Sequence, residues 1–211
     1  MLSNFDFVDQ YPDWNHIAER AKKAEQGMAV APEFAAIFGR SSMELGIKWV
    51  YGAEGMDTRD PYNYGKDREL FALLKDRGFT EVVGDTRLLN MMNQLRLFGN
   101  KAAHGGNALT HKDGVLSLRI LFEFLSWMAY CYTSIQVEKV FDEGILPSGD
   151  GKSAASETDI RQQADKIAAK DEALAKKQHE LEETNRELDD IRERNRKLQE
   201  ELKQLRMARQ Q

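Results

Sequence analysis

Apolar residues recur at helical spacing along the chain as far as Phe141, with positions three and four apart on a shared helix face. Prolines suited to first helical turns and glycines suited to helix ends mark where the helices begin and end. Helices are therefore predicted from Pro12 to about Ala24, from Pro32 to about Val50, over 70–74, from Thr80 to His104, and from about Lys112 to Val140. No segment alternates apolar and polar residues between hairpin turns, so we expect no sheet. Short connections between most of these helices favour an all-α fold, an antiparallel helical bundle.

The tail carries a different pattern, the seven-residue repeat of a coiled coil. Its seam has a positions at Leu181, Leu188, Asn195 and Leu202, and d positions at Ile191, Leu198 and Leu205. Asn195 occupies an a position, where a buried asparagine favours two parallel strands in register. In that arrangement Glu187 faces Arg192 of the second strand, and Glu201 faces Arg206. The repeat predicts a homodimer through a C-terminal parallel coiled-coil helix.

Upstream of this seam the repeat weakens. Ile160, Ile167 and Leu174 continue one apolar stripe, but the matching second stripe is polar or charged. This part is either helical and loosely paired, or docked elsewhere. A stretch rich in Gly and Ser precedes it and is typical of a linker. We therefore expect a helical bundle domain over 1–143, a linker over 144–156, and a helical or coiled-coil extension over 157–211.

Composition narrows the class of protein. The 211 residues carry a net charge of −5, and the two signs are interspersed, which argues against a general binder of phosphate backbones. The single cysteine, Cys131, lies in an apolar stretch and is predicted to be buried and reduced. The start of the sequence has no secretory signal pattern, and no run approaches the ~18 apolar residues of a membrane span. We expect a cytoplasmic protein that binds no membrane.

One short polar motif offers candidate chemistry. Arg96, Asn100 and His104 recur every fourth residue near the end of a predicted helix, so they share a helix face. One interpretation is a structural clamp at the helix end. A second is a metal-independent ribonuclease site, with His104 as general acid and base and Arg96 stabilising the developing charge. A third is a contact with a protein partner or nucleic acid. The three residues are candidates, and no catalytic residue is assigned with certainty.

No cofactor or metal is expected from the sequence. Gly151-Lys152-Ser153 is similar to the end of a phosphate-binding loop, but Leu146 stands where that motif requires glycine. The histidines outside the motif, His16, His111 and His179, lie far apart in the sequence. No metal-binding spacing of cysteine and histidine occurs.

Three stretches of the chain resemble a known family, the N-terminal helical domain of type I restriction enzyme R (HsdR-like) subunits. The resemblance covers about residues 4–146. It is carried by Asn4-Phe5-Asp6-Phe7, by Leu95-Arg96-Leu97-Phe98-Gly99-Asn100-Lys101-Ala102-Ala103-His104, and by Leu121-Phe122-Glu123-Phe124-Leu125-Ser126-Trp127. In that family a charged helical stretch commonly follows the domain, and then a nuclease domain and a helicase motor.

The domain is also similar to the HEPN superfamily, many of whose members are RNases. The distance between Arg96 and His104 in the sequence is longer than in that superfamily's Arg–His signature. In addition, Gly99 precedes Asn100, at a position where the signature has a charged residue. This departure favours a structural or dimer-contact role for the motif over RNA cleavage.

Together, repeat and resemblance imply an assembly or oligomerisation module, non-catalytic by itself, of an R-subunit-like or phage-defence protein. The alternatives are a HEPN-like ribonuclease with Arg96 and His104 at a dimer interface, and a DNA- or partner-recognition domain of a larger restriction complex. The expected partners are a second copy through the coiled coil, other restriction or defence subunits, and nucleic acid within a larger complex. The helical pattern continues to Gln211, which favours a fragment of an R subunit over a stand-alone relative.

Overall fold

The computed structural model describes residues 2–60, 67–103, 109–134, 137–147 and 194. Its α-helices are α1 (Asn15–Gly27), α2 (Pro32–Ala53), α3 (Leu70–Lys75), α4 (Arg77–Val83), α5 (Thr86–Ala103) and α6 (His111–Tyr132). Short 3-10 turns cover Asp6–Gln10, Pro12–Trp14 and Glu143–Ile145. Within the described ranges there is no β-strand, and one isolated bridge joins Arg59 and Asp67. The all-α prediction is confirmed.

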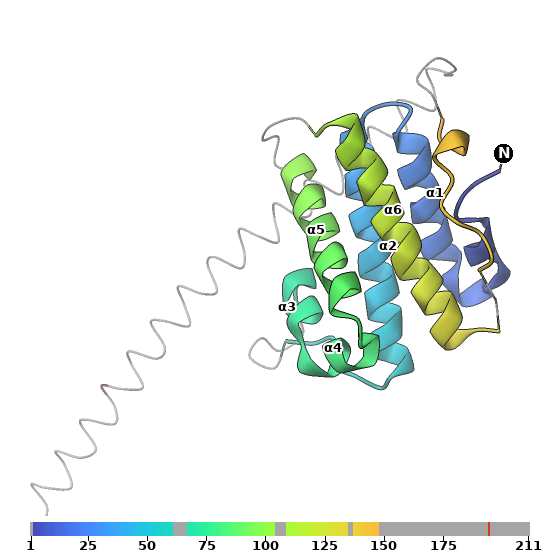
Figure 1. The fold of residues 1–211 in the computed structure, drawn as a ribbon. Coiled ribbons are helices and arrows are strands. Elements are labelled where there is room, and N and C mark those ends of the chain that lie inside the picture. The colour runs from blue at the N-terminus through green and yellow to red at the C-terminus, as the bar shows by residue number, and fades with distance from the viewer. Residues whose placement is uncertain (1, 61–66, 104–108, 135–136, 148–193, 195–211) are drawn as a thin grey trace, which may run out of the picture. The chain divides into compact units, whose positions relative to one another are not determined.

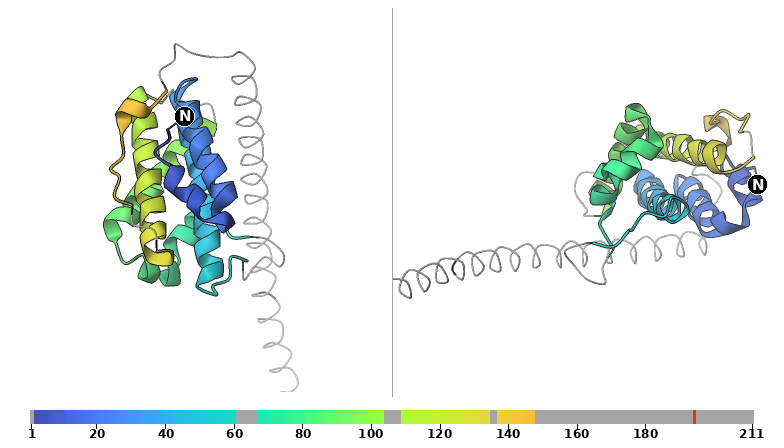
Figure 2. Two further views of the ribbon diagram at one scale, coloured as in Figure 1. Left: turned by 90° about the vertical axis from the view of Figure 1, so that its right-hand side faces the viewer. Right: turned by 90° about the horizontal axis from the view of Figure 1, so that it is seen from below.

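Helix α2 is the centre of the described fold, because α1, α5 and α6 all pack against it (Figures 1 and 2). Three small residues of α2, Gly39, Ser42 and Gly46, lie at these contacts. A Cβ added at Gly39 would lie 3.5 Å from the Leu95 side chain of α5. The Ser42 hydroxyl donates to the Ile17 carbonyl of α1 at 2.9 Å. The side chains packed most completely in the core include Trp14, Tyr51, Phe5, Phe38, Phe79, Phe124, Met43 and Ile47.

Helix α6 is the apolar partner of α2. A capping box starts it, in which Thr110 and Asp113 each bond the other's backbone N–H. Within the described part of the chain, α6 is the one helix long and apolar enough to cross a membrane by length and composition. Of its most apolar 18-residue stretch, 56% is buried inside the protein. A core helix of a water-soluble bundle can be equally long and apolar. This finding leaves the expected cytoplasmic location a prediction.

The predicted helix over 80–104 is wrong at its start. The structure divides this region into α4 and α5, and the break falls at Gly84, whose φ of 65° lies in the left-handed region. Gly78, which follows the predicted helix over 70–74, lies inside α4 and ends no helix. The reason is local: the Asp76 side chain accepts from the Phe79 backbone N–H at 3.2 Å and so starts α4 before the glycine.

The prediction that the last helix continues to Val140 is also wrong. Helix α6 ends at Tyr132, and Thr133 is extended, with its hydroxyl bonded to the carbonyl one turn back. The chain then returns along the bundle, and Phe141 packs its ring 5.8 Å from that of Phe122. Cys131, predicted to be buried, is exposed, because it lies in the last turn of α6.

The predicted linker and tail fall largely outside the described residues. All the seam positions, Leu181, Leu188, Ile191, Asn195, Leu198, Leu202 and Leu205, lie outside them. Of the extension over 157–211 the structure describes Arg194, which is helical and exposed. The predicted coiled coil therefore stays a prediction.

A buried clasp joins the two ends of the helical bundle domain (the head), which lie side by side in Figure 1. Asn4, 3% exposed, donates from its side-chain nitrogen to Glu25 at 2.7 Å and to the Asp142 carbonyl at 3.0 Å. The Asp142 N–H donates back to the Asn4 side-chain oxygen at 2.8 Å. The Asn4 backbone N–H also donates to Glu25, at 3.1 Å. One asparagine thus satisfies a buried carboxylate and holds the segment after α6.

Replacing Asn4 by Ala should lower the free energy of unfolding by about 2–4 kcal/mol, because it removes the amide hydrogen bond to the buried Glu25 carboxylate and both hydrogen bonds to the Asp142 backbone. Chemical denaturation checks this. The matched control is Asn90→Ala on the exposed side of α5, which should change stability by less than about 0.5 kcal/mol. Equal effects of the two substitutions would contradict the clasp.

Gly46 provides a second test, because α6 approaches α2 closely there. A Cβ at Gly46 would lie 2.7 Å from the Phe124 ring and 3.0 Å from the Met128 sulfur. Gly46→Ala should therefore destabilise the protein by about 1–3 kcal/mol through overpacking. Gly52, on the same helix, has no atom within 4 Å of such a Cβ. Gly52→Ala should stabilise by about 0.5–1 kcal/mol, measured by thermal unfolding, and the same sign for both would refute the close approach.

Candidate functional site

The structure places two residues of the predicted polar motif on one edge of α5. The buried face of this helix carries Leu88, Met92, Leu95 and Gly99. Arg96 and Asn100 follow along its margin, and both are half-buried. His104 lies outside the described residues. The motif is therefore described for two of its three members.

Arg96 rests on an aromatic ring and an amide. Its guanidinium lies 5.0 Å from the centroid of the Phe71 ring in α3, and its Nε donates to the Asn93 side-chain oxygen at 3.0 Å. Among the described residues no carboxylate comes within 4.0 Å of this guanidinium, although the clamp interpretation included an acidic partner. Arg96 is thus held by stacking and one neutral hydrogen bond.

Gly99 explains how a second arginine comes close. A Cβ at Gly99 would lie 2.5 Å from Cδ and 2.7 Å from Cβ of Arg40, so the Arg40 stem packs directly on the backbone of α5. Burial lowers the pKa of Arg96, and the neighbouring charge of Arg40 lowers it further, while Glu69 acts in the opposite direction. The glycine of the motif therefore has a packing role, and two cations share this edge of the bundle.

No family model, no curated protein and no solved structure matches the chain. The resemblance to restriction R subunits therefore rests on the sequence motifs, and the site has to be interpreted from its own geometry.

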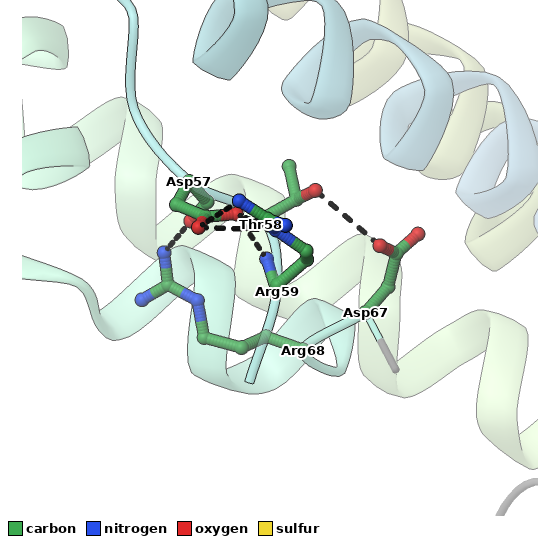
Figure 3. Close-up of polar contacts among 5 residues, drawn as sticks. All are labelled: Asp57, Thr58, Arg59, Asp67 and Arg68. Atoms are coloured by element: carbon green, nitrogen blue, oxygen red, sulfur yellow. Dashed lines mark hydrogen bonds and ion pairs between the residues drawn. The ribbon is translucent and has the colours of Figure 1, made fainter. Parts of the chain in front are cut away.

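A second polar cluster, missed by sequence reasoning, lies in the segment between α2 and α3 (Figure 3). Arg68 joins three parts of it. One terminal nitrogen pairs with Asp76 at 2.7 Å, the other donates to the Asp57 carbonyl, and the guanidinium lies 5.3 Å from the Tyr51 ring centroid. Tyr51, whose pKa burial raises to about 12, donates to the Leu73 carbonyl at 2.9 Å.

The remaining charges of this cluster are balanced. Asp67 accepts from the Thr58 hydroxyl at 3.3 Å and pairs with Lys48 at 3.2 Å. Lys48 also pairs with Glu44, one turn earlier on α2, at 3.0 Å. The cluster therefore anchors the connection to α2 and has a structural role. Its sequence signal, alternating acidic and basic residues in a predicted loop, is too common to single it out.

The other candidate groups are dispersed in the structure. His16 and His111 are exposed on different helices, and His179 lies outside the described residues. Within the described ranges no group of three or more His, Cys, Asp or Glu side chains could hold a metal ion. Cys131 is an exposed residue near Glu54. Partial desolvation of its thiol first, and then that carboxylate, raise the pKa of the thiol, which makes it a poor nucleophile. The Arg96 edge is the described arrangement best suited to binding.

Arg68→Gln should lower the free energy of unfolding by about 1–3 kcal/mol near neutral pH, since it removes a charged hydrogen bond to Asp76. Arg59→Gln, in the same segment but with an exposed ion pair, is the control and should leave stability unchanged. The hydrogen bond from Arg68 lowers the pKa of Asp76 below its usual value, so this contribution is fully present above about pH 5 and is lost progressively as the pH falls through that lowered pKa.

The difference between wild type and Arg68→Gln should therefore shrink as the pH falls from about 7 to about 3. Urea denaturation across this range measures it. A constant difference at every pH would show that the Asp76 ion pair is not what Arg68 contributes.

Proposed function

We propose that this chain is an assembly module, a helical head joined to a parallel, dimeric coiled coil, in a restriction or phage-defence protein of the R-subunit type. The observation that carries the proposal is the heptad seam from Leu181 to Leu205 with Asn195 at an a position. A seam of this kind needs a second strand to bury its leucines. The proposed module is non-catalytic by itself and cytoplasmic.

The head supports this role as a rigid, self-contained bundle. We propose that its topology is antiparallel and HEPN-like. Its consecutive helices α1 and α2 pack side by side across a connection of residues 28–31, and a connection this short makes neighbouring helices antiparallel. The core residues of every described helix belong to one cluster. Such a head has no need of a partner to bury its core, so the tail is free to serve dimerisation.

The main rival is a HEPN-like ribonuclease with Arg96 and His104 at a dimer interface. It is favoured by one observation, the half-buried Arg96 guanidinium without a described carboxylate partner. Metal-free cleavage of RNA by the wild type, abolished in His104→Ala with the fold intact, would support this rival. DNA recognition within a larger complex would instead show a steep loss of DNA affinity with salt.

The proposal predicts a dimeric mass in light scattering at tens of micromolar protein. Asn195→Leu should raise the thermal stability of the assembly and allow higher oligomers or mixed orientation, because the polar pair that specifies two parallel strands is lost. The matched control is Lys197→Leu, which adds a leucine two residues away but outside the seam. It should leave the dimer and its orientation unchanged.

Orientation is measured by disulfide crosslinking of single cysteines placed at the tail end in a Cys131→Ser background. A monomeric wild type would overturn the proposed function. An Asn195→Leu chain with unchanged oligomeric state and orientation would overturn the role of the asparagine. The family part has its own test, a reading frame that continues past Gln211 into nuclease and motor motifs.

A further inference from the structure

The edge of α5 holds two arginines close to one another through backbone packing. Because Gly99 has no side chain, the Arg40 stem lies directly against α5, one turn beyond Arg96. Arg40 makes a further interaction of its own, so its contribution here is a neighbouring positive charge. Both arginines are half-buried, where charges are screened less than on an open surface.

Arg96 is fixed in place and keeps donors available. Its Nε is engaged by Asn93, and the Phe71 ring supports its plane. No described residue accepts a hydrogen bond from its two terminal nitrogens. Asn100, on the next turn of the same edge, makes no hydrogen bond to a described residue either. These unused donors lie where positive charge is concentrated.

Among the described residues, several other arginines have a carboxylate partner, which Arg96 lacks. Arg68 has the Asp76 carboxylate at 2.7 Å, and Arg87, on α5 itself, has that of Glu123 at 3.6 Å. Burial and repulsion from Arg40 lower the pKa of Arg96, although the Glu69 carboxylate acts in the opposite direction. An anion bound at this edge would relieve that repulsion and restore the hydrogen bonds that burial removes.

We infer that Arg96, with Arg40 and Asn100 beside it, forms a binding site for an oxyanion, the phosphate or carboxylate group of a ligand. The two terminal nitrogens of Arg96 form the planar fork that matches two oxygens of such a group. Asn100 supplies a further donor, and Phe71, 48% exposed, provides an apolar wall beside it. The site uses neither His104 nor the dimer seam, so it stands independently of the proposed function.

The experiment titrates the full chain with inorganic phosphate, and separately with acetate, against sodium chloride of equal ionic strength. Two readouts are followed, the thermal unfolding midpoint and the NMR cross-peak of the Arg96 Nε–H. The wild type should show a saturable rise of the midpoint and a saturable shift of that cross-peak. Arg96→Gln should lose about tenfold or more in affinity, and Arg96→Lys should lose most of it because the fork is gone.

The matched control is Arg87→Gln, which removes the same charge from the same helix and should leave anion affinity unchanged. A response to phosphate alone identifies phosphate as the ligand group, and a response to both anions extends the site to carboxylates. Either result supports the site. No saturable response in the wild type, or an equal loss in Arg87→Gln and Arg96→Gln, overturns it. The wild-type titration decides the matter even if an arginine variant fails to fold.

Discussion

The described fold depends on the close approach of three helices to α2. Gly39 faces a leucine of α5, Ser42 bonds to a carbonyl of α1, and Gly46 leaves room for Phe124 of α6. Small residues at these contacts bring the helix axes near enough for the large apolar side chains around them to interdigitate. A bulky side chain at any of the three would separate α2 from one neighbour and open the core. The positions of α1, α5 and α6 follow from this central helix, and α3 and α4 pack in turn against α5.

The candidate site is a consequence of the same constraint. Gly99 of α5 also permits a close approach where α5 meets α2. The space above its backbone is filled by the stem of Arg40. A long basic side chain can cover apolar surface with its methylenes while its charged end reaches the margin. The charged end of Arg40 thus reaches the edge of α5 that also carries Arg96, whose guanidinium rests on the Phe71 ring of α3. Tight helix packing therefore concentrates positive charge at one edge of an otherwise acidic chain.

Local chemistry decided which elements were predictable from the sequence. The start of α2 at Pro32 was predictable because proline fits a first helical turn by itself. The break at Gly84 was not, because two glycines compete there and the Asp76 cap decides between them. The end of α6 was missed because the packing of Phe141 is a tertiary contact. For the site, spacing alone placed Arg96 and Asn100 on one helix edge, but no periodicity could reveal that Arg40, on another helix, lies beside them.

The clasp and the arginine edge are built from different elements. Asn4 ties the N-terminal turn, α1 and the segment after α6 into one unit, so the chain leaves the head beside its own N-terminus. The arginine edge belongs to α5, α2 and α3, which the clasp does not touch. Two described helices, α2 and α6, pack against both α1 and α5. Any coupling between the clasp and the arginine edge would therefore pass through the packing of α2 and α6.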